Sequence, residues 1–212
     1  MQSQSLALRA ATAQTVHPVP VSPTGFVSSI EMMGVPMPFS AGAEIYGENE
    51  PAEYLYKVIS GAVRTYKVLS DGRRQIGGFY LPGDVFGLER GEEHSFSAEA
   101  ITECRVLVIK RANLVSLAAR DNDVARQLWA MTAKELRRAQ DHLMLLIKTA
   151  QERVAGFLLE MASRGASTRE IELPMSRQDI ADYLGLTIET VPNFQFVARF
   201  DPRWPTLNLG VA

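Results

Sequence analysis

The sequence predicts an α+β protein, with an antiparallel β domain first, a long helix next and a helix-turn-helix last. Glycines separate short alternating apolar runs from about Phe39 to Lys110, a pattern typical of an antiparallel sandwich or barrel. From Asp121 the apolar spacing becomes helical. Two short helical patterns then flank Gly185. At 212 residues the chain is long enough to bury a core without disulfides.

The β region is expected over residues 25–120, after a loosely held arm at 1–24 that shows no periodicity. The pair Asp71-Gly72 lies between two β-rich runs, and such a pair is a strong signal for a hairpin turn. The strand-like runs are, in order, YLYKVISG, AVRTYKVL, QIGGFYL, PGDVFG, SFSAEAI and CRVLVIK.

A long helix is expected over residues 121–149, with Asn122 or Asp123 capping its start. Neither proline nor glycine interrupts residues 121–155, so the spacing predicts one continuous helix. Its apolar seam, spaced 3 and 4 residues apart, indicates packing against the same helix of a second chain; the alternative is a long core helix within one chain. The seam is Leu136, Ala139, Leu143, Leu146 and Ala150.

Residues 150–212 are expected to form the helix-turn-helix domain. Ser176 is a good N-cap, and Asp179 follows three residues later as the acid of a capping box. Gly185 supplies the turn, and Thr187 caps the second helix. The buried stripe of the first helix is predicted to be Ile180, Ala181 and Leu184.

Composition excludes several classes of protein. The net charge is −2, so any contact with nucleic acid must be local. Cys104 is the only cysteine, which excludes a disulfide framework, a four-cysteine zinc site and an iron–sulfur cluster with several cysteine ligands. No run approaches the roughly 18 apolar residues of a membrane span, and the N-terminus lacks a signal-peptide pattern. We therefore expect a cytoplasmic protein that does not associate with membranes.

The order of these parts resembles the CRP/FNR family of bacterial transcription regulators, and the wording is closest to its FixK branch. The resemblance covers about residues 25–191 and is carried by EYLYKVISGAVRTYKVLSDGRRQIGGFYLPGDVFGLE and ELPMSRQDIADYLGLTIETV. It implies a jelly-roll-like β-roll similar to a cyclic-nucleotide-binding domain, a dimerisation helix and a winged helix-turn-helix. It further implies a homodimeric activator of microaerobic, denitrification or nitrogen-fixation genes that binds a palindromic site on double-stranded DNA and contacts RNA polymerase.

The resemblance also implies which side chains meet DNA. The start of the first helix would anchor on phosphate, where hydroxyl, guanidinium, amide and helix N-terminus can all face an anion. The second helix would enter the major groove, where a glutamate can accept from cytosine and a threonine can contact a thymine methyl. The phosphate anchors are Ser176, Arg177 and Gln178, and the reading positions are Thr187, Glu189 and Thr190.

An effector in the β-roll is not expected. Residues 1–103 hold no cysteine, so the iron–sulfur cluster of the oxygen-sensing branch cannot form. The stretch PGDVFGLERGEEHSFSAEA lacks the Arg-Ser pair that would hold the phosphate of a cyclic nucleotide. Haem stays open only through His17, His94 or His142, none of which lies in a haem motif. We therefore expect no cofactor and a structural role for Cys104.

The sequence leaves the family pattern after Val191. After ETV the family pattern has a small residue and then a guanine-reading arginine, as in ETVSR. This chain has Pro192 and Asn193 at those two positions. A proline in a helix interior costs about 3 kcal/mol, and residues 151–212 carry six arginines against eight acids. A frameshift explains the departure, because TCC-CGA-ACT-TT read two bases later encodes Pro-Asn-Phe. The alternative is a natural tail with an adhesive aromatic patch at Phe194, Phe196, Phe200 and Trp204.

Three other functions are alternatives to a DNA-binding activator. A chain with an impaired recognition helix would act as an inactive dimerisation partner of an intact relative. A small-molecule-binding β-roll module is disfavoured by the missing Arg-Ser pair. An enzyme is disfavoured because Glu92, Glu93 and His94 accompany no nucleophile motif or metal pair, and are better explained as a charged loop.

Overall fold

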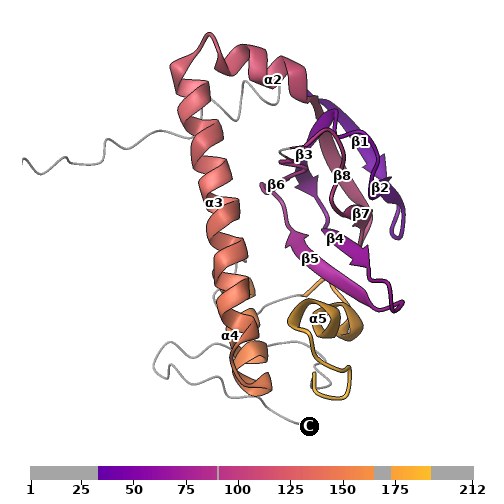
Figure 1. The fold of residues 1–212 in the computed structure, drawn as a ribbon. Coiled ribbons are helices and arrows are strands. Elements are labelled where there is room, and N and C mark those ends of the chain that lie inside the picture. The colour runs from indigo at the N-terminus through magenta and orange to yellow at the C-terminus, as the bar shows by residue number, and fades with distance from the viewer. Residues whose placement is uncertain (1–32, 90, 165–172, 192–212) are drawn as a thin grey trace, which may run out of the picture.

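The computed structural model describes residues 33–89, 91–164 and 173–191. Within them, two four-stranded antiparallel sheets form the β-roll (Figure 1). The first sheet consists of β1 (Val35–Phe39), β8 (Cys104–Lys110), β3 (Tyr54–Ser60) and β6 (Val85–Phe86), in that order. The second consists of β2 (Glu44–Tyr46), β7 (Ser97–Ala100), β4 (Val63–Val68) and β5 (Arg74–Tyr80), in that order. The arm expected at residues 1–24 lies outside the described residues.

The turns of the β-roll follow from glycines in the left-handed region of backbone space. The predicted hairpin joins β4 and β5, and Gly72 at its tip has a φ of 84°. Gly61 between β3 and β4 has a φ of 82°, and a Cβ there would lie 2.4 Å from the carbonyl oxygen of Glu103. These positions suit glycine because it has no Cβ. The core between the sheets is built on Tyr46, Tyr56, Val58, Val63, Phe86, Ala98, Ala100, Cys104 and Val106.

A short helix, α2 (Arg111–Ala118), follows β8 and was not expected from the sequence. Lys110 makes no side-chain capping bond, and the first turn holds no acidic residue, so the usual start signals are missing. The guanidinium of Arg111 instead donates to the carbonyls of Gly91 and Glu89, which ties the loop before β7 to the start of α2.

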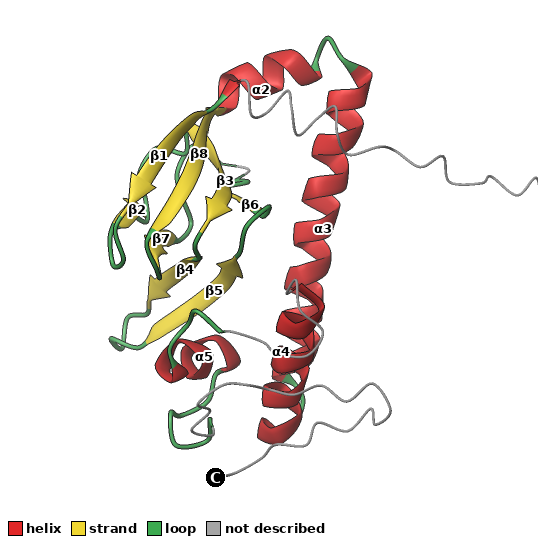
Figure 2. Ribbon diagram, turned by 180° about the vertical axis from the view of Figure 1, so that it is seen from behind, coloured by secondary structure: helices red, strands yellow, loops and turns green. Residues whose placement is uncertain are grey.

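The long helix α3 (Asn122–Leu146) runs along one side of the β-roll (Figure 2). Its cap is Asp121, which accepts from the backbone N–H groups of Asp123 and Val124; the expectation of Asn122 or Asp123 was wrong. Among the described residues, no helix is long and apolar enough to cross a membrane.

The prediction of one continuous helix through residue 155 was also wrong, because α3 ends at Leu146 and α4 (Ala150–Arg164) begins after a short break. The cause is a second capping box. Thr149 donates its N–H and its hydroxyl to the Glu152 carboxylate at 2.9 and 2.7 Å, and its hydroxyl accepts from the Glu152 N–H. The spacing Thr-x-x-Glu starts a new helix even where neither glycine nor proline ends the old one.

The last described helix, α5 (Arg177–Leu184), packs against β5, as both ribbon views show (Figure 2). A single core joins the two, so the β-roll and the C-terminal helices share their apolar interior. Its buried members are Ile76, Phe79, Leu145, Val154, Phe157, Leu158, Met161, Met175, Ile180, Ala181, Tyr183, Leu184 and Val191.

Candidate nucleic-acid interface

The start of α5 is closed by a full capping box. The Ser176 hydroxyl accepts from the Asp179 N–H at 3.1 Å, and the Ser176 N–H donates back to Asp179 Oδ2 at 3.0 Å. Gly185 ends the helix in the left-handed conformation, with a φ of 62°. Both local predictions are confirmed. Ser176 is exposed while Asp179 is only 2% exposed, so the box presents the serine to solvent and buries the acid.

Gln178, in the first turn of α5, is exposed like Ser176. Its Nε2 donates to Asp182 Oδ1 at 2.6 Å, one turn further along the helix. This bond fixes the amide group without covering it. The amide keeps a second Nε2 hydrogen, which is free to donate to an anion.

Arg177 does not face outward as a phosphate anchor would. Its Nε and Nη2 donate to the carbonyl oxygen of Val191 at 3.1 and 2.6 Å, and Nη2 also donates to that of Ile188 at 3.0 Å. In a helix the carbonyl of Ile188 would accept from the N–H of residue 192. The sequence places Pro192 there, and proline has no N–H; the Ile188 carbonyl accepts instead from the Val191 N–H and from the guanidinium.

The three predicted reading residues lie on an exposed turn that follows Gly185. Within the described residues this turn is not a helix, and its hydrogen bonds span three residues, from Thr190 to Thr187 and from Val191 to Ile188. The hydroxyls of Thr187 and Thr190 lie 3.2 Å apart. The pKa of Glu189 is lowered because its own backbone N–H and the Thr187 hydroxyl donate to its carboxylate. Glu189 is therefore a charged acceptor.

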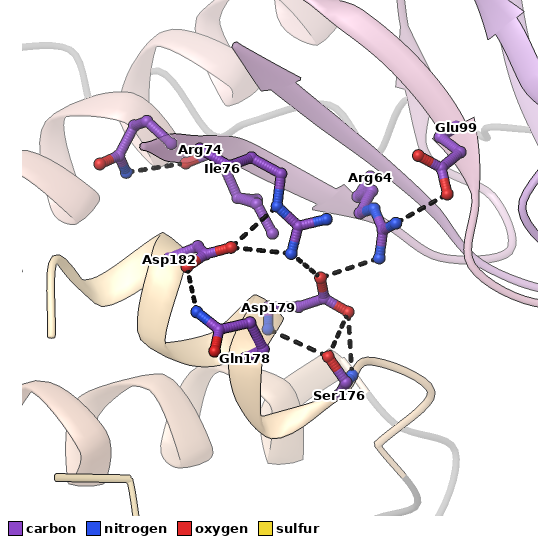
Figure 3. A network of polar contacts seen from close by, with 9 residues as sticks. Arg64, Arg74, Ile76, Glu99, Ser176, Gln178, Asp179 and Asp182 are labelled. Carbon is purple, nitrogen blue, oxygen red and sulfur yellow. Dashed lines mark hydrogen bonds and ion pairs between the residues drawn. The ribbon is translucent and has the colours of Figure 1, made fainter. Parts of the chain in front are cut away.

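Two arginines of the β-roll reach α5, which local sequence patterns could not reveal (Figure 3). Arg64 of β4 and Arg74 of β5 both donate to Asp179 Oδ1, at 2.8 and 2.6 Å. Arg74 also pairs with Asp182 at 2.7 Å. More than a hundred residues separate these partners along the chain, so only the folded structure brings them together.

The predicted seam of α3 lies open on the surface of the single chain. Leu136 and Leu143 are 59% and 62% exposed, and Ala139 is exposed between them. Trp129, one heptad before Leu136, is 77% exposed and was missed. Leu146 is half-buried.

Ala150 begins α4 and therefore does not continue the seam on α3.

The interior of the β-roll is filled by its own rings. His94 is 1% exposed and stacks on Tyr46, with ring centroids 3.6 Å apart. Tyr56 and Phe86 complete the group, 5.1 Å from one another. Burial lowers the pKa of His94, against the opposing effect of Glu89, whose carboxylate lies 3.8 Å from Nδ1. The imidazole is accordingly held in its neutral form.

Two protein families match the chain over the parts just described. The family "Cyclic nucleotide-binding domain" matches residues 36–121. The family "Crp-like helix-turn-helix domain" matches residues 152–193.

Curated relatives and solved structures agree with these matches. The nitrogen fixation regulation protein FixK of Azorhizobium caulinodans is 52% identical over 168 residues, which are 76% of this chain and 68% of that protein. FixK of Rhizobium meliloti is 47% identical over 72% of this chain and 70% of its own length. The structure of FixK2 from Bradyrhizobium japonicum superposes with a TM-score of 0.72 at 60% identity, covering 74% of this chain and 80% of that one.

The residues of the β-roll do not fit the cyclic nucleotide that the first family description implies. A buried phosphate needs a cation or several donors. Among the described residues, His94 is neutral, lies beside Glu89 and stacks on Tyr46, and the nearby Arg111 guanidinium is engaged with backbone carbonyls. The space between the sheets is occupied by side chains of the protein itself.

Proposed function

The chain belongs to the CRP/FNR family of DNA-binding transcription regulators, and on that premise we propose that it acts as a homodimer on a two-fold symmetric DNA site. Each protomer would present α5 and the turn after it to one half-site. Half-sites should lie about 34 Å apart, one turn of the double helix. The FixK relatives are named for the regulation of nitrogen fixation, which supports this role. The same proposal includes activation of microaerobic and denitrification genes through a contact with RNA polymerase.

One observation carries this proposal: α5 is buried on one side, while its N-cap and one residue of its first turn are exposed. Ser176 and Gln178 are exposed, while Asp179 and Ile180 are buried against the β-roll and its neighbours. The spare amide hydrogen of Gln178 at the helix N-terminus suits a phosphate oxygen, whereas the single hydroxyl hydrogen of Ser176 is donated to Asp179. Glu189 and the two threonines of the turn supply the acceptor and methyl groups that read base edges.

Dimerisation is supported by the open seam of α3. Trp129, Leu136 and Leu143 repeat every seven residues, and all three are exposed in the single chain. An apolar stripe with that period is the pattern of two helices that pack side by side. Covering it with the same stripe of a second chain would bury all three side chains.

The test is selection of bound sequences from a pool of random duplex DNA by the full-length chain. We expect enrichment of paired, inverted half-sites about 10 base pairs apart from centre to centre. Gln178→Ala should then weaken binding of the selected duplex about ten- to a hundredfold, the effect of losing one hydrogen bond to a charged group. Gln151→Ala, at an exposed glutamine in the first turn of α4, is the matched control and should leave binding unchanged. Enrichment of single half-sites, or equal effects of the two variants, contradicts the proposal.

A second function is favoured by one observation, the inward turn of Arg177. This side chain is engaged with Ile188 and Val191, and residues 151–212 carry a net charge of −2. Both reduce the electrostatic attraction on which affinity for DNA depends. The chain would then pair with an intact relative and lower its activity.

The two functions separate in one experiment. A FixK relative is bound to its own labelled duplex, and this chain is added in increasing amounts. An inactive partner releases the duplex as mixed dimers form, whereas with a competent regulator the labelled duplex stays bound to protein.

A further inference from the structure

Two aspartates of α5 each contact the β-roll through one carboxylate oxygen and another residue at the start of α5 through the other (Figure 3). On the side of the β-roll, Asp179 Oδ1 accepts from Arg64 and Arg74, and Asp182 Oδ2 accepts from Arg74 Nε at 2.8 Å. Arg64 is balanced in turn by Glu99, its cross-strand partner on β7, at 2.7 Å. The guanidinium of Arg74 thus donates to two carboxylates that lie about one helical turn apart.

The second oxygen of each aspartate holds a side chain on the exposed edge of α5. Asp179 Oδ2 accepts from the hydroxyl of Ser176 at 2.8 Å and from its N–H at 3.0 Å. Asp182 Oδ1 accepts from the amide of Gln178 at 2.6 Å. Each carboxylate therefore bridges an arginine of the β-roll and a polar group that faces solvent.

We propose that Arg64 and Arg74 are positioning residues for DNA binding, which act through Asp179 and Asp182 on Ser176 and Gln178. This inference rests on the proposed function, because it assumes that the exposed edge of α5 meets phosphate. The β-roll then orients the DNA-binding helix through fixed charges, with no ligand in the chain of contacts. That role fits a β-roll whose interior is filled by its own side chains.

The burial of these charges separates them from ordinary surface ion pairs. The side chains of Asp179 and Arg64 are 2% and 15% exposed, so the loss of one partner leaves a charge largely removed from water. The pair of Arg73 and Asp71, at the tip of the same hairpin, is 77% and 50% exposed. Exposed pairs of that kind contribute little.

The alternative is that the apolar core alone orients α5, and that the charged residues at its edge do not contribute to the orientation. Ile180, Ala181 and Leu184 do pack with Ile76 and Phe79 of β5. Apolar contacts are non-directional, however, whereas a two-pronged arginine–carboxylate contact fixes an angle. The two explanations differ in what the removal of one guanidinium does to α5.

The first measurement is hydrogen exchange of the full chain without DNA, followed in peptides that cover residues 173–191. Arg74→Gln and Arg64→Gln should each speed exchange in α5 at least tenfold relative to the parent. Arg73→Gln removes the same charge from the neighbouring exposed position and should leave exchange unchanged. Arg74→Lys keeps a charge without the fork and should give an intermediate rate. This fourth variant guards against a glutamine variant that fails to fold.

The second measurement is binding of the duplex selected above. Arg74→Gln should weaken binding about tenfold, and Arg73→Gln less than twofold. Combining Arg74→Gln with Asp182→Asn should weaken binding no more than the stronger single change, because the two residues act through one another.

Each outcome decides a separate question. Equal exchange in the Arg74→Gln, Arg73→Gln and parent chains overturns the proposal, since the core alone would then orient α5. Faster exchange with unchanged DNA binding overturns the positioning role and leaves only a structural one. If the parent binds no duplex, the proposed function fails by itself, and exchange still decides whether the two arginines hold α5.

Discussion

Arg177 of α5 shows how a proline elsewhere in the chain can change what an arginine side chain contacts. The family resemblance assigns this side chain to phosphate, yet its guanidinium holds the carbonyls of Ile188 and Val191. A buried carbonyl without a donor costs free energy, and Val191 is fully buried. The proline at 192 removes the N–H that a helix would supply to Ile188.

Replacement of the proline should therefore release the arginine. In the parent, Arg177→Gln removes a charged donor from both carbonyls, of which that of Ile188 still accepts from the Val191 N–H, and should lower the free energy of unfolding by about 1–3 kcal/mol. In a Pro192→Ala background the same change should cost about 1 kcal/mol less, because residue 192 again has an N–H. Denaturant unfolding of the four chains gives both numbers. Equal costs in the two backgrounds would show that Arg177 does not replace the missing donor.

His94 should make the fold sensitive to mild acid. Burial lowers its pKa, so the unfolded chain takes up a proton as the pH falls through the ordinary value of 6.5, while the folded chain does not. Stability is then greatest above that pH and declines below it, by at most about 1.4 kcal/mol per pH unit for this residue.

His94→Phe keeps a ring against Tyr46 and removes the titration, so the decline between pH 7.5 and 5.5 should become shallower. Unfolding midpoints measured across that range check this. Burial also lowers the pKa of His142, which leaves a residual slope. An unaltered slope would place the acid sensitivity elsewhere.

At the scale of elements, the sequence predicted those parts whose signals are local. The hairpin at Asp71-Gly72 and the capping box at Ser176 depend on residues within four positions of one another, and both are confirmed. The helix α2 escaped prediction because it lacks such signals. The break after α3 escaped for the opposite reason, because a capping signal at Thr149 was present and was overlooked.

A charge in the α3 seam should prevent pairing of two chains. Leu136→Glu would bring two carboxylates together in an apolar contact, and like charges without partners do not tolerate loss of water. We expect a monomer by sedimentation or light scattering at concentrations where the parent is a dimer. Ala130→Glu adds the same charge at an exposed position about a quarter turn from Trp129, and it should remain dimeric. A dimeric Leu136→Glu chain would place the interface on another surface.

For the whole molecule, what the sequence could not predict is how the parts meet. The sequence predicts a strand at β5, but nothing local says that Ile76 and Phe79 in it contact α4 and α5. The same limit applies to Arg64 and Arg74, whose partners lie more than a hundred residues away. Composition gave only an overall charge near neutrality, whereas function depends on where single charges are placed.

The shared core predicts that the β-roll and the C-terminal helices unfold together. Phe157 is fully buried, with ring centroids 5.9 Å from Phe79 and 5.7 Å from Tyr183. Phe157→Ala should lower the free energy of unfolding by about 3–5 kcal/mol and move one calorimetric transition as a whole. Leu159→Ala, at a half-exposed neighbour on the same helix, should change it far less. Two separate transitions in the parent would contradict a common core.

Trp129 provides a fluorescent probe within the α3 seam. Its indole is 77% exposed on the single chain, and the only other tryptophan in the sequence is Trp204. In a Trp204→Phe chain, all indole emission would come from the contact between two protomers. That emission lies at shorter wavelength when the ring leaves water, so dilution should shift it to the red as the protomers separate. Assembly can then be followed by fluorescence without any label.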